Sequence, residues 1–480
     1  MFDSSDIPDR QVVIIGGGLA GMLAAAALSK YTDRIIIVER DRVPQASAPR
    51  RGLPQGRHVH LLWSGGSKAI EELLPGTTGR LLTAGAHRLS IPTNMVGFSS
   101  QGWFRRWSEE SHHVLLSSRD LLDATIRSEV LAHPHVTLLE ETEMLGLAGT
   151  PWYVTGARLR TADGQTRTVP ANLVIDASGR GSRAPSWLTA LGLPATPEKT
   201  VDSGLVYASR TFQAPPGAET YPVVNVQADP RGSGPGQSAT LTPIEDSKWL
   251  VTIAGTRGGE PTSDPAAFIP FALGLRDPIV GKLLTHAEPL TDVSLTRTTS
   301  NRRRFFENAQ EWPQGFVVLG DAAAAYNPVY GHGMTVAAQG ALALREIITT
   351  AGLTLSGSAQ KAQQAIARPI NTAWNLATSQ DIHYLGASDT PPTTSERLTA
   401  RFLDRLIRTS TGSGRVARAV TDVMTMERSP ARLASPSVLL AVALGPPRKQ
   451  LTAAPLSAEE LAAALDHEQH TEASVEPASA

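Results

Sequence analysis

Apolar runs of strand length alternate with stretches of helical periodicity near the start of the chain. Val12 to Ile15 is a short apolar run suited to a buried strand, and the small-residue stretch that follows predicts a helix to about Lys30. A second apolar run, Ile35 to Val38, predicts another strand. Near residue 316 the pattern recurs, because Phe316 to Leu319 predicts a buried strand and a helical stretch spans about 335–348.

Between these segments the polar and apolar positions predict further elements of both types. Leu61 to Leu74 has a helix-like pattern that ends at Pro75-Gly76, and an amphipathic helix opens at Ser118 and runs to about Leu131. Segment 42–58 is too polar and too rich in Pro, Arg and Gly for regular structure. Strands are predicted at 135–141, 153–161 and 166–176.

A group of β-forming segments is separated by Gly, Pro and Asp residues and predicts a separate, mainly antiparallel sheet. The segments are 201–212, 221–229, 237–245, 249–256 and 289–299. The C-terminal part is largely helical in pattern, with a Pro/Thr/Ser break at 388–395, and its Ala/Glu/Ser-rich end predicts disorder.

The first glycine-rich turn has the spacing Gly16-x-Gly18-x-x-Gly21 between a predicted strand and a predicted helix. Gly16 permits a tight turn, Gly18 lets a pyrophosphate approach the helix N-terminus, and Gly21 lets helix and strand pack closely. Glu39 ends the next strand, where an acidic side chain hydrogen-bonds a ribose hydroxyl. The pattern predicts dinucleotide binding, and a glycine-rich turn without a ligand is the alternative.

The second glycine-rich turn lies nearly 300 residues later. Gly320-Asp321 closes the strand at 316–319, and Pro328 to Gly333 forms a turn before the next helix. A carboxylate at a strand end, followed by glycines at a helix start, is suited to a polar, partly anionic ligand. The two turns together suggest a flavoprotein.

Composition narrows the possible functions. With 480 residues the chain predicts two or three domains. The 44 Lys and Arg residues balance 45 Asp and Glu residues, so neither nucleic acid nor an anionic membrane is expected as a partner. The absence of cysteine excludes disulfides and thiolate chemistry, so redox chemistry must come from a bound cofactor. No apolar run is long enough for a membrane span, and we expect a cytoplasmic protein.

The order of four motifs resembles the flavin-dependent monooxygenases of the para-hydroxybenzoate hydroxylase fold along essentially the whole chain. The motifs are the first glycine turn with Glu39-Arg40, SRDLLDATIR (118–127), VIDASGRGSR (174–183) and GDAAAAYNPVYGHGMTVA (320–337). Within that superfamily, LPQGRHVHLLWSGG (53–66) and NPVYGHGM (327–334) are similar to the actinobacterial polyether epoxidases of the lasalocid and monensin type.

The resemblance implies an α/β fold with a discontinuous, Rossmann-like FAD-binding domain of the second glutathione-reductase type. That domain is predicted at 10–80, 110–185 and 300–350. An inserted substrate-binding domain, built on an antiparallel β-sheet, is predicted at 81–109 and 186–299. A helical region at 351–467 and a disordered tail at 468–480 complete the prediction.

The resemblance also implies roles for individual residues. The glycines of the first turn would wrap the FAD pyrophosphate, Glu39 would bind the adenosine ribose, and Arg40 would lie beside the adenine or phosphate. Arg119 would reach the FAD from a helix start, with a solvated helix residue as the alternative. Asp321 would hydrogen-bond the ribityl chain and Pro328 would lie against the isoalloxazine. The backbone of the following residues would face its pyrimidine edge, namely Gly331, Gly333, Met334 and Thr335.

Two departures from the family pattern affect the reductant and one contact. Ser178 stands where aromatic hydroxylases have the aspartate of a motif associated with both NAD(P)H and FAD. A separate flavin reductase therefore fits as well as direct oxidation of NAD(P)H. Thr335 replaces the usual asparagine, which removes a side-chain contact and keeps the backbone contacts.

The resemblance implies epoxidation of the alkenes of a large apolar polyene or polyketide-type product by O2, through a flavin C4a-hydroperoxide. An aromatic or terpenoid hydroxylase, a prenyl reductase and a redox-silent cyclase on the same fold are the alternatives. Tyr326, Tyr330 and His332 are candidates to face the substrate, although they could simply pack the loop. His58 and His60 favour a structural pair over catalysis, and no metal site is expected.

Overall fold

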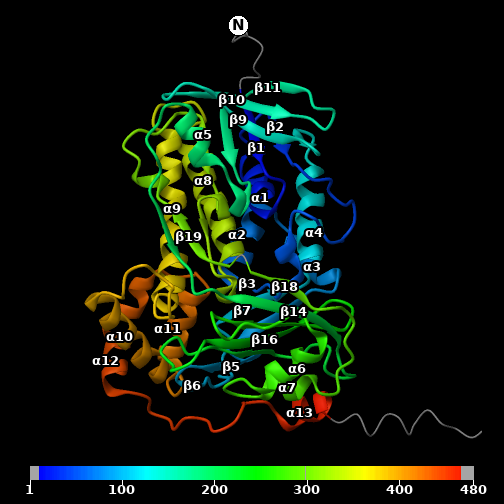
Figure 1. Ribbon diagram of the computed structural model, residues 1–480, viewed down its shortest axis with the longest axis vertical. Helices are drawn as coiled ribbons and strands as arrows, with labels where there is room; N and C mark the ends of the chain where they lie inside the picture. The colour runs from blue at the N-terminus through cyan, green and yellow to red at the C-terminus, as the bar shows by residue number, and fades with distance from the viewer. Residues whose placement is uncertain (1–9, 298, 466–480) are drawn as a thin grey trace, which may run out of the picture.

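A parallel sheet forms one end of the molecule, which we describe from a computed structural model covering residues 10–297 and 299–465 (Figure 1). Its strand order is β20-β12-β1-β2-β8 and all neighbouring pairs are parallel. The strands are apolar runs buried between covering layers, as expected for a parallel sheet. They are β1 (Gln11–Ile15), β2 (Arg34–Val38), β8 (Val136–Leu139), β12 (Leu173–Asp176) and β20 (Phe316–Val318).

Helices from distant parts of the chain pack around this sheet. The first helix, α1, packs against α4 and α8, and α8 also packs against α2 and α9. Together with the parallel sheet they form the largest hydrophobic core. The helices are α1 (Leu19–Leu28), α2 (Ser64–Leu73), α3 (Thr77–Thr83), α4 (Arg119–Leu131), α5 (Ala184–Ala190), α8 (Gly333–Ala351) and α9 (Ser358–Asp381).

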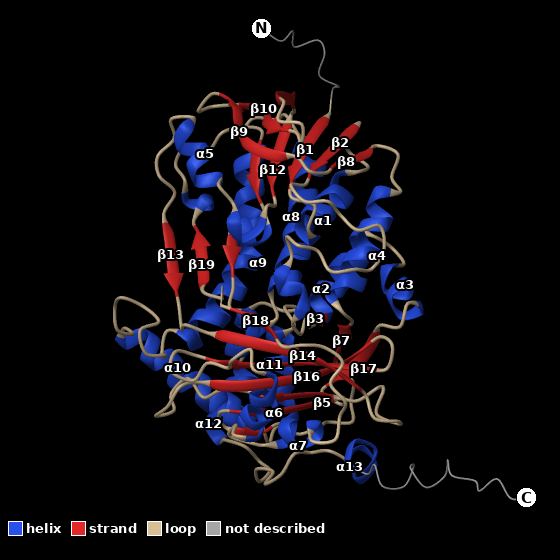
Figure 2. Ribbon diagram, turned by 45° about the vertical axis from the view of Figure 1, so that its right-hand side comes forward, coloured by secondary structure: helices blue, strands red, loops and turns tan. Residues whose placement is uncertain are grey.

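A mixed seven-stranded sheet lies at the other end of the molecule (Figure 2). Its strand order is β18-β14-β17-β16-β15-β5-β6. All its pairs are antiparallel except β15 with β5. Helices α6 (Pro265–Leu273) and α7 (Ile279–Leu284) pack on one face and share a second core with it. The strands are β5 (Met95–Ser99), β6 (Gly102–Trp103), β14 (Val206–Gln213), β15 (Val223–Val226), β16 (Gln237–Ile244), β17 (Lys248–Gly255) and β18 (Ser294–Thr296).

Three small antiparallel sheets complete the strand inventory of the described residues. The sheet β11-β10-β9 lies at the end of the molecule that carries the parallel sheet, as both views show. The other two are β13-β19-β21 and β3-β7-β4. Their strands are β3 (Leu62–Trp63), β4 (His87–Ile91), β7 (His112–Leu116), β9 (Glu143–Gly149), β10 (Val154–Arg160), β11 (Thr166–Pro170), β13 (Glu198–Val201), β19 (Asn301–Arg304) and β21 (Ala324–Ala325).

The C-terminal part of the described chain is helical, as the sequence pattern predicts. Helix α10 (Thr394–Ser410) begins with a capping box between Thr393 and Glu396 and packs with α11 (Gly414–Met424) and α12 (Pro436–Leu444). The last described helix is α13 (Ala458–Leu465). The predicted disordered tail at 468–480 lies outside the described residues. In the part of the chain that is described, no helix is long and apolar enough to cross a membrane.

The fold class predicted from the sequence is confirmed, since the chain combines a parallel Rossmann-like sheet, further antiparallel sheets and C-terminal helices. The domain boundaries remain a prediction. Two local predictions differ from the structure. The strand predicted at 166–176 is two strands, β11 and β12, because the chain leaves one sheet at Ala171-Asn172 and enters another. The helix predicted from Leu61 begins only at Ser64, because Leu62–Trp63 pairs with β7.

Candidate functional site

The first glycine-rich turn joins the end of β1 to the start of α1. Gly16 has φ of 101°, and a Cβ atom there would lie 2.6 Å from the carbonyl oxygen of Ala177. A Cβ atom at Gly21 would lie 1.9 Å from the carbonyl oxygen of Gly16. A Cβ atom at Gly18, in contrast, would meet no described atom within 4 Å. The fold therefore requires two of the glycines, while the third leaves open space beside the helix N-terminus.

The N-termini of α1 and α8 share a feature that suits an anionic or polar ligand. Neither the residue before α1, Gly18, nor the residue before α8, His332, provides a side-chain cap. Neither helix has an acidic residue in its first turn. The first N–H groups of a helix have no partner within the helix and carry partial positive charge. Both glycine turns thus present donors that a cofactor can use.

Glu39 lies against the first glycine turn. It is 7% exposed, and its Oε2 accepts hydrogen bonds from the N–H of Gly17 at 2.8 Å and from Arg50 at 3.0 Å. Its Oε1 accepts a hydrogen bond from the N–H of Asp41 at 3.1 Å. The side chain of Arg40 is 71% exposed, with Asp41 as a charged neighbour at 3.8 Å. The structure thus places Arg40 at the surface, outside the buried cluster around Glu39.

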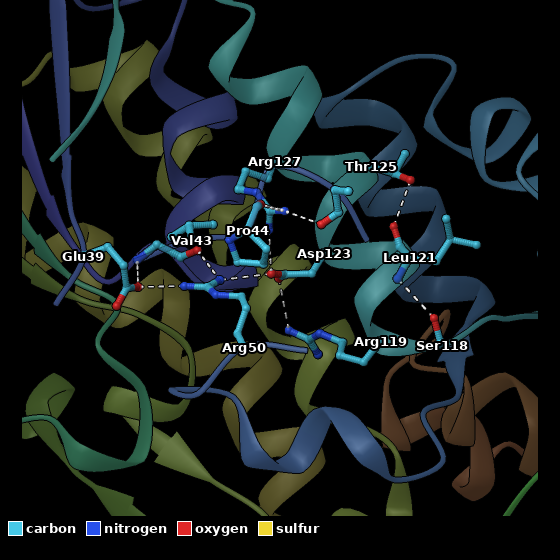
Figure 3. A network of polar contacts seen from close by, with 12 residues as sticks. Glu39, Val43, Pro44, Arg50, Ser118, Arg119, Leu121, Asp123, Thr125 and Arg127 are labelled. Atoms are coloured by element: carbon cyan, nitrogen blue, oxygen red, sulfur yellow. Dashed lines mark hydrogen bonds and ion pairs between the residues drawn. The ribbon is translucent and has the colours of Figure 1, made fainter. Parts of the chain in front are cut away.

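A buried ion-pair network connects Glu39 to α4 (Figure 3). Arg50 Nη2 binds Glu39, and its Nη1 donates to Asp123 Oδ2 at 3.0 Å and to the carbonyl oxygen of Gly17 at 2.9 Å. Arg127 Nη1 reaches the same Asp123 oxygen at 3.1 Å. Arg119 lies 3.9 Å from the other oxygen of Asp123. Three guanidinium groups therefore surround one carboxylate in the interior.

Sequence reasoning did not identify Arg50, Asp123 or Arg127. The sequence spacing could have identified Asp123 and Arg127, because they follow Arg119 at intervals of four residues and share one face of α4 with it. No sequence pattern identifies Arg50, since it lies in a Pro/Arg/Gly-rich loop and is buried only through contacts with distant elements.

Arg119 retains an unused donor in the interior. It is 7% exposed, and its Nε has no hydrogen-bond partner among the described residues. Burial lowers the pKa of this guanidinium, while Asp123 and Asp321 oppose the shift. A small cavity beside it is also lined by His60, Leu115 and Met334. A buried donor without a partner costs about 1–3 kcal/mol, so Arg119 fits a ligand that supplies an acceptor.

Asp321 lies in a short 3-10 helix, η5 (Gly320–Ala322), beside the start of α8. A Cβ atom at Gly333 would lie 3.7 Å from Asp321 Oδ1, which places the carboxylate next to the first turn of that helix. Burial raises the pKa of Asp321, and the nearby Arg180, Arg119 and Arg302 act against that shift. The side chains of Arg119 and Asp321, which were predicted separately, thus lie close enough for their charges to interact.

The second glycine turn has a defined backbone geometry. A 3-10 helix, η6 (Pro328–Tyr330), is capped by Asn327, whose Oδ1 accepts the N–H of Val329 at 3.1 Å. Gly331 follows in the left-handed region with φ of 68°. Met334 and Thr335 are buried in the first turn of α8, and the Thr335 hydroxyl has no partner among the described residues. The isoalloxazine side of the site remains a prediction for this turn and the start of α8.

The three candidates to face the substrate differ in their partners. Tyr326 is 5% exposed and its hydroxyl has no partner in the described chain. Tyr330 donates its hydroxyl to Asp381 Oδ1 at 2.7 Å. His332 contacts the carbonyl oxygen of Met424 through Nε2 at 2.9 Å, which assigns the proton to that nitrogen. Burial lowers the pKa of His332 to about 4, so the ring is neutral at pH 7.

Two further residues connect the motifs around this turn. Arg180 donates to the carbonyl oxygens of Ser300, at 2.9 Å, and of Tyr326. Arg180 belongs to the VIDASGRGSR motif, yet sequence reasoning gave it no role. Ser178, the departure from the family pattern, donates its hydroxyl to the buried Asp176 at 2.5 Å. The motif therefore contacts the segment before the second glycine turn through Arg180.

The histidines near residue 60 have protein partners, in keeping with the structural interpretation. His58 uses its two ring nitrogens to contact Ser209 Oγ at 2.7 Å and Thr296 Oγ1 at 2.8 Å. His60 Nδ1 lies 2.8 Å from the carbonyl oxygen of His58. Among the residues that the structure describes, no group of three His, Cys, Asp or Glu side chains is placed to bind a metal.

The chain is similar to a protein family and to individual proteins. A family model described as "FAD binding domain" matches residues 9–363. Protein Rv3254 of Mycobacterium tuberculosis is 28% identical over 434 residues, which cover 82% of this chain and 90% of that protein. A kynurenine 3-monooxygenase of Salinispora tropica is 27% identical over 412 residues, which cover 82% of this chain and 85% of that protein.

Among solved structures, a flavoprotein/dehydrogenase from Cytophaga hutchinsonii is similar with a TM-score of 0.63 at 15% identity. The match covers 90% of this chain and 96% of that structure, and it supports the fold alone. The family match spans both glycine turns, Arg119 and Asp321. By this match, the chain belongs to the FAD-binding domain family.

Proposed function

We propose that the protein is a flavin-dependent monooxygenase that epoxidises alkenes of a large polyene or polyketide-type substrate. The observation that carries the proposal is the convergence of Arg119, Asp321 and the uncapped N-terminus of α8 beside the second glycine turn. The similarity to a kynurenine 3-monooxygenase supports the choice of monooxygenation.

The residues present fit FAD. We assign the pyrophosphate to the turn at Gly16 to Gly21, where the site of Gly18 is open. We assign the ribose to Glu39 and the ribityl chain to Asp321. The unused Nε of Arg119 would donate to the cofactor, and the first N–H groups of α8 would stabilise negative charge on the flavin ring.

Bound FAD, once reduced, supplies with O2 an electrophilic oxygen atom. The protein must then hold an alkene beside the flavin and exclude water. Such a reaction requires no general base. The histidine in the second glycine turn, His332, is a weak base, because its ring has a pKa of about 4 and donates its proton to a backbone carbonyl. Deprotonation of a phenol would need a stronger base than this side chain.

Aromatic hydroxylation is the second candidate, because a relative of similar length is a kynurenine 3-monooxygenase. The product separates the two reactions. FAD-loaded, reduced protein is mixed with aerated buffer and farnesol, and the product is analysed by NMR. We expect loss of an alkene signal and gain of an epoxide. Formation of a phenol from an aromatic probe, with farnesol unchanged, would contradict epoxidation and support the second candidate.

The proposal also concerns the source of the electrons that reduce the flavin. We propose that either NAD(P)H or a separate flavin reductase supplies the electrons. An anaerobic titration with NADH and NADPH distinguishes them. Rapid bleaching of the flavin band would show direct reduction, whereas bleaching only after addition of a flavin reductase would show the second route.

A further inference from the structure

The two faces of the seven-stranded sheet differ in chemistry. Side chains alternate between faces along a strand. Ala208, Leu241 and Val251 belong to the apolar core that includes α6 and α7. Their neighbours in sequence, on the opposite face, are largely polar.

On this opposite face the strand register aligns a row of small polar residues. Directly paired residues lie side by side on one face of a sheet. The row crosses β18, β14, β17, β16 and β15, which are neighbours in the sheet order. Its members are Ser294, Ser209, Thr252, Thr240 and Asn225.

This polar face looks toward the proposed FAD site. Segment 56–59 lies between them, because a Cβ atom at Gly56 would be 3.6 Å from Arg119 Cγ. From the same segment, His58 contacts Ser209 Oγ at 2.7 Å and the N–H of Val59 donates to Thr252 Oγ1 at 2.9 Å. Ser209 and Thr252 therefore lie one loop away from Arg119, and Thr240 pairs with Thr252 on the next strand.

Contacts within the protein use the hydrogen-bonding groups in one part of the row and leave some of these groups unused in another part. Ser209 and Thr252 bond each other at 2.5 Å and also bind segment 58–59. Asn225 donates its amide to Thr240 Oγ1 at 2.7 Å, and no described group donates to its amide oxygen. Thr240 is a half-buried residue in a central strand, and its remaining exposure lies on the polar face because Ala239 and Leu241 fill the other.

Ser238 adds an independent sign of a ligand. It is two residues before Thr240 on β16, so its side chain lies on the same face. The residue is only 5% exposed, and no described residue forms a hydrogen bond with its hydroxyl. The side chain is largely buried and its hydroxyl keeps unused hydrogen-bonding capacity, so Ser238 can bind a ligand that supplies polar atoms.

We propose that Asn225, Ser238 and Thr240 form a subsite for a hydroxyl or carbonyl oxygen of the alkene substrate. The inference rests on the proposed function and specifies its substrate class as an oxygen-bearing chain, in place of a pure hydrocarbon. A substrate hydroxyl would donate to the amide oxygen of Asn225 and accept from Thr240 or Ser238. A site of this kind rejects an analogue without the hydroxyl, because its own buried polar groups would then lack partners.

Isothermal titration calorimetry on the full chain tests the subsite with two probes, farnesol and its deoxy hydrocarbon analogue. We expect farnesol to bind about tenfold or more tightly, as one hydrogen bond allows. Thr240→Val and Ser238→Ala should each weaken farnesol binding about tenfold and leave hydrocarbon binding unchanged. Thr242→Val is the matched control, because this buried hydroxyl on the same face already donates to the carbonyl oxygen of Leu250 at 3.3 Å.

Equal affinity for the two probes, or unchanged farnesol affinity in both variants, would overturn the subsite, as would failure of the wild type to bind farnesol. Ser238→Ala removes a single side-chain oxygen, so it keeps the test valid if Thr240→Val does not fold. Calorimetry needs no oxygen transfer. Selective farnesol binding without turnover would contradict only the proposed function, and equal epoxidation of both probes would contradict only the subsite.

Discussion

Replacing Asp123 tests whether the buried network in Figure 3 stabilises the FAD-binding half of the molecule. Asp123 accepts from Arg50 at 3.0 Å and from Arg127 at 3.1 Å, and all these side chains are at most 7% exposed. In Asp123→Ala, Arg50 keeps Glu39, and Arg127 keeps the carbonyl oxygen of Pro44 at 2.7 Å. Arg119 would have no carboxylate within ion-pair distance in the described chain.

The expected loss follows from leaving buried charge unpaired. Removing one partner of a buried ion pair costs about 3–5 kcal/mol, so we expect Asp123→Ala to lower the free energy of unfolding by about 4 kcal/mol. Asp123→Asn keeps the volume and one acceptor, and we expect a loss of about 2 kcal/mol. The matched control is Asp120→Asn in the first turn of the same helix, for which we expect about 0.5 kcal/mol.

Urea denaturation followed by far-UV circular dichroism measures these differences. The slopes with urea must agree between variants for the free energies to be compared. A loss below about 1 kcal/mol in Asp123→Ala, equal to that of the Asp120 control, would refute a stabilising role for the network.

Three other predictions concern the two turns. Gly18→Ala should fold normally and lose FAD affinity, because its Cβ atom would enter the open space assigned to the pyrophosphate. Gly21→Ala should fold poorly, because its Cβ atom would lie 1.9 Å from a carbonyl oxygen. Thermal melting and flavin fluorescence distinguish these outcomes. Asp321→Ala should weaken FAD binding about tenfold or more while melting near the wild-type temperature, and normal flavin occupancy would show that the ribityl contact is misplaced. The unfolded chain binds a proton at His332 near pH 6.5 whereas the folded chain resists protonation down to about pH 4, so the contribution of His332 to stability should fall by roughly 3 kcal/mol over that window as pH drops. His332→Gln should make that part of the pH profile less steep, with His58, His60 and His113 supplying the remaining slope, and an unchanged profile would contradict the assignment.

Local patterns predicted the parts of the site that depend on short-range geometry. The glycine turn at 16–21 and the position of Glu39 beside it depend on two neighbouring strands and one helix, so the sequence alone predicted that they lie together. Asp321 and the second turn were found in the same way. The parallel sheet then brings the two turns together, which explains why segments nearly 300 residues apart could be assigned to one site.

The parts that could not be predicted depend on contacts between distant segments. Arg50 looks like a solvated loop residue and is buried only because Glu39 and Asp123 meet it in space. Tyr330 was a candidate for substrate contact, and its hydroxyl binds Asp381, 51 residues later. The polar row on the seven-stranded sheet requires the strand register, which hydrophobic patterning does not specify across strands that are far apart in sequence.

Isotope labelling tests most directly whether the protein transfers oxygen from O2 to an alkene. FAD-loaded protein is reduced and then exposed to ¹⁸O₂ in unlabelled water with farnesol, and the product is analysed by mass spectrometry. We predict one ¹⁸O atom in each epoxide formed. An unlabelled product, or label that enters only from H₂¹⁸O, would contradict the monooxygenase assignment and favour a cyclase or hydratase-type reaction on the same fold.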